Sequence, residues 1–358
     1  MKTLALPLAA LAVLSAAACK PSETTQDGDT LAATSDPLIL AARDNFKPIP
    51  EGPAQIAGVT ATPELVALGE ALYFDPRLSQ SHALSCASCH NMGLGGADAR
   101  PTSIGHHWQL GGRNAPTVLN AGYNFVQFWD GRAEDLVAQA AGPIANPVEM
   151  AMLTGQLVPT LKSIPGYAPM FAKAFPAEAD PISEKTVPIA IAAYEATLVT
   201  PNAPFDRFLR GDAAALTDQQ KRGLKSFMDS GCTACHSGTN VGGAMYAKFG
   251  LVADPSEDVR PAADTGRFAI TGDEADRYAF KVPTLRNIAL SAPYFHTGSV
   301  WSLDDAVQIM AKTQVGKTLS AGETADIVAF LGALTGDQPK VAMPVLPPVT
   351  GKSVKPVN

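Results

Sequence analysis

The clearest pattern of apolar positions in this 358-residue chain is that of an α-helix beginning near residue 62. Thr62, Pro63 and Glu64 carry the usual starting signals: a hydroxyl cap, a proline in the first turn and an acidic side chain beside it. The leucines at 65, 68 and 72 then fall on one helical face. Signals for strands are sparse, so the pattern predicts a mostly α-helical fold with long loops, ordered from about residue 61 onward.

An internal repeat organises the chain. Residues 68–75, followed by Cys-Ala-Ser-Cys-His at 86–90, are repeated as residues 222–229, followed by Cys-Thr-Ala-Cys-His at 232–236. Downstream of these motifs, Pro-Thr-Val-Leu-Asn at 116–120 matches Pro-Thr-Leu-Arg-Asn at 283–287, and a glycine follows at the same distance from each asparagine. We therefore expect two versions of one helical unit in tandem.

The N-terminus carries a processing segment. Lys2 precedes an apolar stretch, Leu4–Ala18, that is too short to span a bilayer. Three alanines stand directly before Cys19, which resembles a bacterial lipoprotein signal at 1–18 with Cys19 as the lipidated residue. The alternative is an ordinary secretory signal cleaved near the same place. Both predict export, and Lys20, which is not an acid, favours the outer membrane among the possible sites of the anchor.

Composition excludes some classes of protein. The chain is 46% hydrophobic and 17% charged, which is typical of a globular protein. Its net charge of -7 gives no electrostatic support for nucleic-acid binding.

Residues 19–45 are rich in Ser, Thr, Asp and Ala and predict a flexible tether. The proline-rich residues 338–358 predict an extended tail that packs back on the N-terminal domain.

The five cysteines point to c-type haem. Four of them, Cys86, Cys89, Cys232 and Cys235, form two Cys-x-x-Cys pairs, and lipidation accounts for Cys19. His90 and His236 directly follow the pairs, which completes the haem-attachment motif twice. A redox dithiol or half a zinc site would also use Cys-x-x-Cys, but neither explains the adjacent histidine in both copies.

The repeat predicts two unequal haems. Met310 lies on the predicted helix after Gly298, and the same distance from Gly131 leads to Pro143, which cannot bind iron. A methionine opposite the histidine raises the potential of a haem, so we expect His236 and Met310 to hold an electron-transfer haem. Met310 could instead be a core residue, and Met245 is the main rival ligand.

The first haem has a candidate ligand of another kind. His106 and its neighbour His107 lie in a glycine-flanked loop, from which a histidine could bind the His90 haem and leave when the loop moves. The alternative is a histidine at the surface.

Longer strings of residues resemble the bacterial di-haem cytochrome c peroxidases over about residues 60–340. The matching strings are Ser103–His106, Arg113–Thr117, Gln127–Arg132, Pro147–Met150 and Pro293–His296. The resemblance implies an enzyme that reduces hydrogen peroxide to two waters. It also implies an N-terminal peroxidatic haem domain at 46–199 and a C-terminal electron-transfer haem domain at 200–337, both similar to cytochrome c. The electron donor would be a small cytochrome c or a cupredoxin, and the enzyme a periplasmic homodimer.

The resemblance also assigns roles to single residues. It implies that His106 is a displaceable distal ligand, that Glu149 is the acid and base at the peroxide with Gln139 as its companion, and that Trp129 lies between the haems. Met310 matches the methionine ligand of the family. A calcium ion would be held by Asn114 and by the main-chain carbonyls of Ser291 and Pro293; the family more often has threonine where this chain has Ser291.

Other interpretations stay open at this point. Glu149 could be an acid at a helix start, Trp129 a core residue and Asn114 part of a turn before a proline. Two other functions compete: a di-haem electron carrier without catalysis, and a related enzyme that oxidises a protein or organic partner. Pro143 and Glu149 argue against the first. Met310 argues against the second, because such relatives typically replace that methionine with tyrosine.

Overall fold

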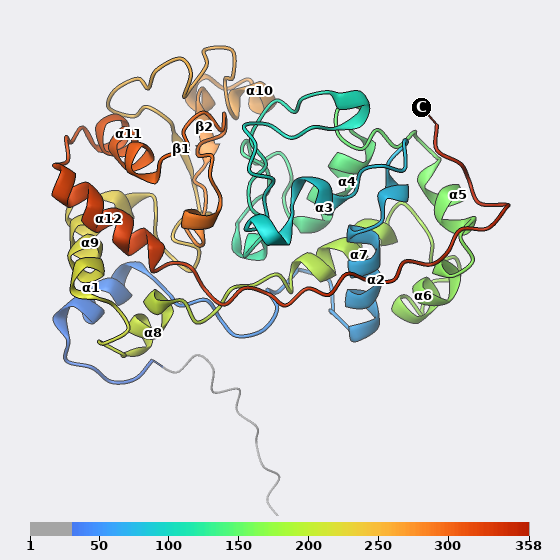
Figure 1. Cartoon of the computed structure of the whole chain (residues 1–358), viewed down its shortest axis with the longest axis horizontal. Helices are drawn as coiled ribbons and strands as arrows, with labels where there is room; N and C mark the ends of the chain where they lie inside the picture. Colours follow the sequence, from blue (N-terminus) through green and yellow to red (C-terminus); the bar gives the residue numbers. More distant parts are fainter. Residues whose placement is uncertain (1–30, 358) are drawn as a thin grey trace, which may run out of the picture.

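The computed structural model describes residues 31–357, and these form an elongated molecule of two lobes (Figure 1). The predicted signal peptide and Cys19 lie outside this range. The expectation of a mostly helical fold is confirmed. The bounds are α1 Pro37–Asn45, α2 Pro63–Tyr73, α3 Cys86–Cys89, α4 Leu136–Ala145, α5 Leu157–Lys162, α6 Tyr167–Ala174, α7 Thr186–Glu195, α8 Pro204–Arg210, α9 Asp218–Asp229, α10 Phe268–Thr271, α11 Leu303–Val315 and α12 Ala321–Gly332, with strands β1 Tyr246–Lys248 and β2 Ala279–Lys281.

The first lobe is built around α2 and α7, with α4 and α6 packed beside them. The predicted start of α2 is confirmed: the Thr62 side chain accepts a hydrogen bond from the Leu65 amide at 3.2 Å. Leu65, Leu68 and Leu72 are all buried in the core of this lobe, as their helical spacing predicts. Helix α7 is apolar on nearly all sides because neighbouring elements surround it.

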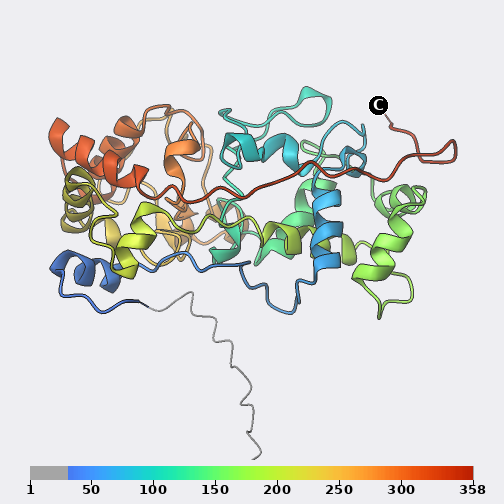
Figure 2. The ribbon, with the colours of Figure 1, turned by 60° about the horizontal axis from the view of Figure 1, so that its bottom comes forward.

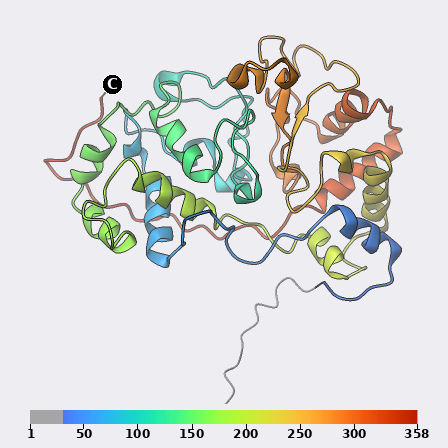
Figure 3. The same ribbon diagram turned by 180° about the vertical axis from the view of Figure 1, so that it is seen from behind.

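The second lobe packs α9 against α12, with α11 on one side and the two antiparallel strands nearby. It also contains α1, which comes from the start of the described chain (Figure 3). The prediction of a flexible tether over residues 19–45 is therefore wrong for residues 37–45, which form α1. The prediction that ordered structure starts near residue 61 is wrong for the same reason. Asp36 caps α1. Ile39, Ala42 and Phe46 are buried against the second lobe, and the ring centroids of Phe46 and Phe205 lie 5.2 Å apart.

The repeat units meet along a polar seam. Asn120 and Asn287, which match in the repeat, both adopt the left-handed conformation, with φ of 60° and 59°. Both donate a hydrogen bond to the Thr200 hydroxyl, at 2.7 and 2.9 Å. Thr200 thus joins the equivalent turns of the two lobes.

The C-terminal segment runs back along the first lobe (Figure 2). The Arg77 guanidinium donates to the Pro347 carbonyl at 2.7 Å, and the Val357 amide donates to the Gln80 carbonyl at 3.1 Å. Val341 and Leu346 also contact the apolar core of that lobe.

Matching glycines lie at close contacts between helices in both lobes. A Cβ added at Gly69 of α2 would lie 1.9 Å from the carbonyl oxygen of Ala190 in α7. A Cβ added at Gly223 of α9 would lie 1.8 Å from the carbonyl oxygen of Asp326 in α12. Both obstacles are backbone atoms, so the helices would have to move apart. The two glycines occupy equivalent positions of the repeat, which indicates one packing solution used twice.

We expect Gly223→Ala to lower the free energy of unfolding by about 1–3 kcal/mol, because the added methyl overpacks the contact between α9 and α12. Gly322→Ala in α12 is the matched control. No atom lies within 4 Å of its added Cβ, and alanine favours helix, so it should stabilise by about 0.4–1 kcal/mol. Denaturant unfolding of the holoprotein measures both, and equal effects would contradict the packing argument.

Candidate active site

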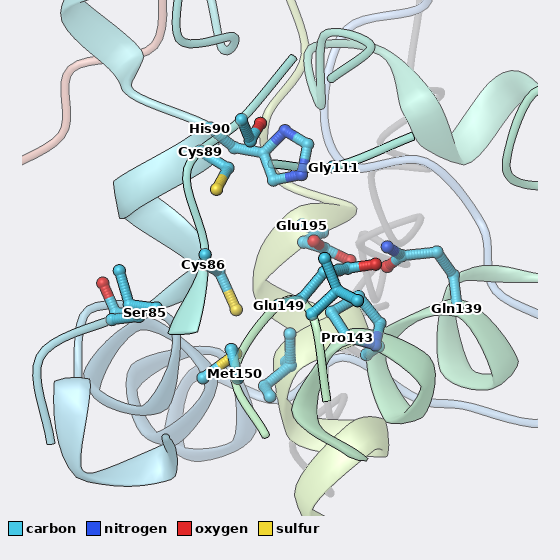
Figure 4. Close-up of a pocket in the computed structure, with 16 residues that line it drawn as sticks. Ser85, Cys86, Cys89, His90, Gly111, Gln139, Pro143, Glu149, Met150 and Glu195 are labelled. Atoms are coloured by element: carbon cyan, nitrogen blue, oxygen red, sulfur yellow. The ribbon is translucent and has the colours of Figure 1, made fainter. Parts of the chain in front are cut away.

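The first Cys–His motif points its side chains into a cavity of the first lobe (Figure 4). Cys86 and Cys89 lie one turn apart on α3, and His90 follows directly. The Tyr73 hydroxyl of α2 donates to the His90 carbonyl at 2.9 Å and so ties the motif to the core. One helical turn thus brings two thiols and an imidazole to the same space.

The opposite wall of this cavity comes from α4 and the segment after it. Gln139 and Pro143 of α4 face the cavity, and Glu149 enters it a few residues later. Asn146 donates from its Nδ2 to Glu149 Oε1 at 2.7 Å. Burial raises the pKa of the Glu149 carboxyl, and Arg132 and the bond from Asn146 partly offset that rise.

The second motif lies beside a larger cavity of about 280 Å³ in the second lobe. Cys232 begins a short 3-10 turn, Cys232–Ala234, and His236 follows Cys235. His236 Nδ1 lies 3.2 Å from the Val241 carbonyl, and a bond there leaves Nε2 free to bind a metal. Burial lowers the pKa of His236 to about 4, which keeps the imidazole in the neutral form that a metal needs.

The two cavities differ at the equivalent position of the repeat. Met310 lines the second cavity with Cys232, Cys235 and His236, whereas Pro143 lines the first. Met245, the rival ligand, is 39% exposed and does not line the second cavity. The donor groups fit a c-type haem in both cavities, since each cavity has two thiols and one histidine beside them. None of these four cysteines forms a disulfide bond.

The comparisons with known proteins agree with this donor chemistry. Residues 63–214 match the family described as di-haem cytochrome c peroxidase. A cytochrome c551 peroxidase of Pseudomonas aeruginosa is 53% identical over 326 residues, which cover 91% of this chain and 94% of that protein. The chain belongs to the di-haem cytochrome c peroxidase family. Two haems per chain follow from this membership and match the two motifs.

Further relatives of this peroxidase family support the assignment. A cytochrome c551 peroxidase of Nitrosomonas europaea is 48% identical, and the match covers 87% of this chain and 90% of that protein. The solved structure of a MauG-like protein associated with microbial copper homeostasis resembles the chain with a TM-score of 0.71 and 30% identity, covering 80% of this chain and 93% of that one.

His106 does not line the cavity of the peroxidase's first lobe. Its side chain is buried and stacks on His107 with ring centroids 3.9 Å apart, while Gly105 forms the cavity wall. The His106 amide donates to the Glu149 carbonyl at 2.8 Å. A Cβ at Gly105 would stand 1.9 Å from the Val148 carbonyl oxygen, so the glycine allows this loop to lie against the segment that carries Glu149.

Trp129 and the expected calcium residues surround the second cavity. Trp129, Asn114, Ser291 and Pro293 all line it. The Trp129 indole donates to the Asn114 carbonyl at 2.9 Å, and the Asn114 side chain donates to the Arg100 carbonyl at 2.8 Å. Within residues 31–357, no group of three or more His, Cys, Asp and Glu side chains could hold a metal ion. Asn114, Ser291 and Pro293 offer amide, hydroxyl and carbonyl oxygens.

Glu195 lines the first cavity but is not among the site residues predicted from the sequence. This residue ends α7, is 5% exposed and lines the first cavity together with Glu149 and Gln139. Its signal in the sequence was a lone acid in the otherwise apolar run from 186 to 200. An unpaired carboxyl in such a run needs a reason, since burial of a charge is costly.

Proposed function

We propose that this protein reduces hydrogen peroxide to two waters with electrons from a small cytochrome c or a cupredoxin. The difference between the two cavities carries the proposal. The second cavity is lined by Met310 together with its Cys–His motif, whereas the first is lined by Pro143, Glu149 and Gln139 together with its own motif. When bound, the two haems supply one site that exchanges electrons and one that accepts peroxide. Relatives that are named for cytochrome c551 support a small cytochrome as the donor.

Glu149 is the proposed acid and base at the peroxide. Cleavage of the O–O bond needs a group that takes a proton from one oxygen and gives it to the other. The raised pKa of the Glu149 carboxyl makes it better suited to carry that proton, and Asn146 fixes the direction of the carboxyl. Gln139, whose amide neither gains nor loses a proton near neutral pH, orients the peroxide from α4.

His90, His236 and Met310 are the proposed permanent ligands, and each domain has the character of a c-type cytochrome. Cys86, Cys89, Cys232 and Cys235 attach the haems. Trp129 serves electron transfer between the two sites. His106 is the proposed displaceable ligand, and the bond from its amide to the Glu149 carbonyl links movement of its loop to the position of the acid.

We expect Met310→His to lower the potential of the C-terminal haem, because imidazole replaces the thioether that raises it. Redox titration followed by absorption measures this. Met245→Leu is the control and should leave the potential unchanged, since Met245 lies away from the cavity. An unchanged potential in Met310→His would assign the ligand to another residue.

Calcium between the lobes is part of the proposal. Asn114 from the first repeat unit and Ser291 and Pro293 from the second line one cavity, and oxygen ligands from the two units suit that ion. A carbonyl ligand tolerates serine in place of threonine at 291.

The proposed location is the periplasm, with a lipid on Cys19 as the anchor, the outer membrane favoured, and a homodimer as the working form. The motif before Cys19 supports lipidation, and c-type haem attachment suits an exported chain. No helix in residues 31–357 is both long and apolar enough to cross a membrane.

Steady-state peroxide consumption by the purified holoprotein tests the function, with a reduced cytochrome c as donor and calcium present. Turnover only after pre-reduction would support the peroxidase and the His106 switch. Turnover in both states would support the peroxidase and exclude the switch. Absence of turnover with several donors would favour an electron carrier or an enzyme that oxidises a protein partner.

A further inference from the structure

A second carboxyl faces the peroxide cavity besides Glu149. Glu195 enters from the end of α7, on a different element from Glu149, and both side chains line a cavity of about 60 Å³ (Figure 4). Only 5% of Glu195 is exposed. Its Oε2 atom is buried and has no hydrogen-bond partner among the residues that the structure describes. Glu195 thus lines the cavity and carries one buried carboxyl oxygen that no described residue satisfies.

The surroundings of Glu195 favour its protonated form. The titratable groups near it or in the same cavity are Tyr73 of α2, Cys86 and Cys89 of α3, His90, Tyr194 of its own helix and Glu149. Burial lowers the pKa of His90 and keeps its imidazole neutral. None of these is a cation, and no basic side chain in the described part of the chain offsets the cost of burial. Burial thus raises the pKa of Glu195 to about 8. A protonated carboxyl has one hydrogen to donate.

Peroxide reduction needs protons that Glu149 alone does not supply. Reduction of one peroxide to two waters consumes two electrons and two protons. When the O–O bond breaks, Glu149 passes the peroxide's own proton from one oxygen to the other, and the first water leaves with both peroxide protons. The second oxygen then takes two electrons from the redox partner and two further protons to leave as water.

We propose that Glu195 is the proton donor for this second half of the reaction. It gives one of the two protons to the second oxygen, directly or through water in the cavity. Solvent supplies the other proton and then reprotonates the Glu195 carboxylate. The inference rests on the proposed peroxidase function and adds a second acid to it. Glu149 and Glu195 then divide the work: the first moves a proton within the peroxide, and the second brings a new one.

Glu195→Gln tests this, because glutamine keeps the size and a hydrogen-bond donor but cannot release a proton. We expect kcat to fall by about 10²-fold, with both haems attached and their absorption spectrum unchanged. Glu195→Asp, which keeps a titratable acid, should retain more activity than Glu195→Gln. Wild-type activity in Glu195→Gln would overturn the proposal. A wild-type enzyme without turnover would instead refute the peroxidase function.

A measurement without turnover tests the protonation of Glu195. A carboxyl with a higher pKa in the folded than in the unfolded protein loses its stabilising proton as pH rises, here from about 4.5 to about 8. Wild type should therefore lose stability relative to Glu195→Gln across this interval, as measured by thermal unfolding of the holoproteins. A difference that does not change with pH would overturn the proposal. If Glu195→Gln fails to take up haem, Glu195→Asp serves instead. As pH rises, its activity should fall at a lower pH than that of wild type, and an alkaline limb of the pH profile at the wild-type position would overturn the proposal.

Discussion

Glu149→Gln is expected to lower peroxide turnover by about 10²- to 10⁴-fold while both haems stay attached. The substitution removes the only proton that Glu149 can carry but keeps its size, and Asn146 can still contact the amide oxygen. Steady-state turnover with a reduced cytochrome c measures the effect, and the haem absorption spectrum checks the haem content.

The matched control is Glu134→Gln, an exposed glutamate shortly before α4, which should leave turnover at the wild-type level. It removes the same negative charge from the same lobe. If Glu149→Gln keeps turnover within a few-fold of wild type, Glu149 is not the acid at the peroxide. Glu195 would then be the next carboxyl to consider, because it lines the same cavity.

Asp206→Asn is expected to lower the free energy of unfolding by about 3–5 kcal/mol, because it leaves the charge of Arg286 buried without a counter-ion. The side chains of Asp206 and Arg286 are fully buried, and Asp206 Oδ1 lies 2.8 Å from Arg286 Nη1. Asp206 also accepts hydrogen bonds from the amides of Ile49 and Ala203, each at 3.0 Å. Arg286 donates further to the Lys47 and Thr239 carbonyls.

This ion pair joins parts of the second lobe that are distant in the sequence: the segment after α1, helix α8 and the turn at Arg286. The control is Asp229→Asn, which breaks an exposed ion pair with Lys225 and should cost at most about 1 kcal/mol. Denaturant unfolding of the holoproteins measures both. Equal, small losses would indicate that the Lys47 and Thr239 carbonyls satisfy the guanidinium without Asp206.

The haem sites could be predicted from the sequence because their chemistry is local. Two thiols and a histidine must lie within one helical turn to hold one macrocycle, so five consecutive residues reveal each site. The difference between the sites followed from counting along the repeat, and the structure places Pro143 and Met310 in the walls of the first and second cavities. The start of α2 was equally local, since its capping and apolar signals lie within a few residues.

Tertiary structure decided the features that depend on distant neighbours. Residues 37–45 have the composition of a tether, yet they form a helix because the second lobe offers an apolar surface to Ile39, Ala42 and Phe46. In the sequence Glu195 is a lone acid in an apolar helix, and only the packing of α7 beside α2 and α4 brings it into the same cavity as Glu149. The sequence by itself determined that this protein holds two c-type haems, because the spacing of two cysteines and a histidine fixes each attachment site. The fold decided which carboxyls share a cavity and which charges are buried, because burial is set by contacts between segments far apart in the chain.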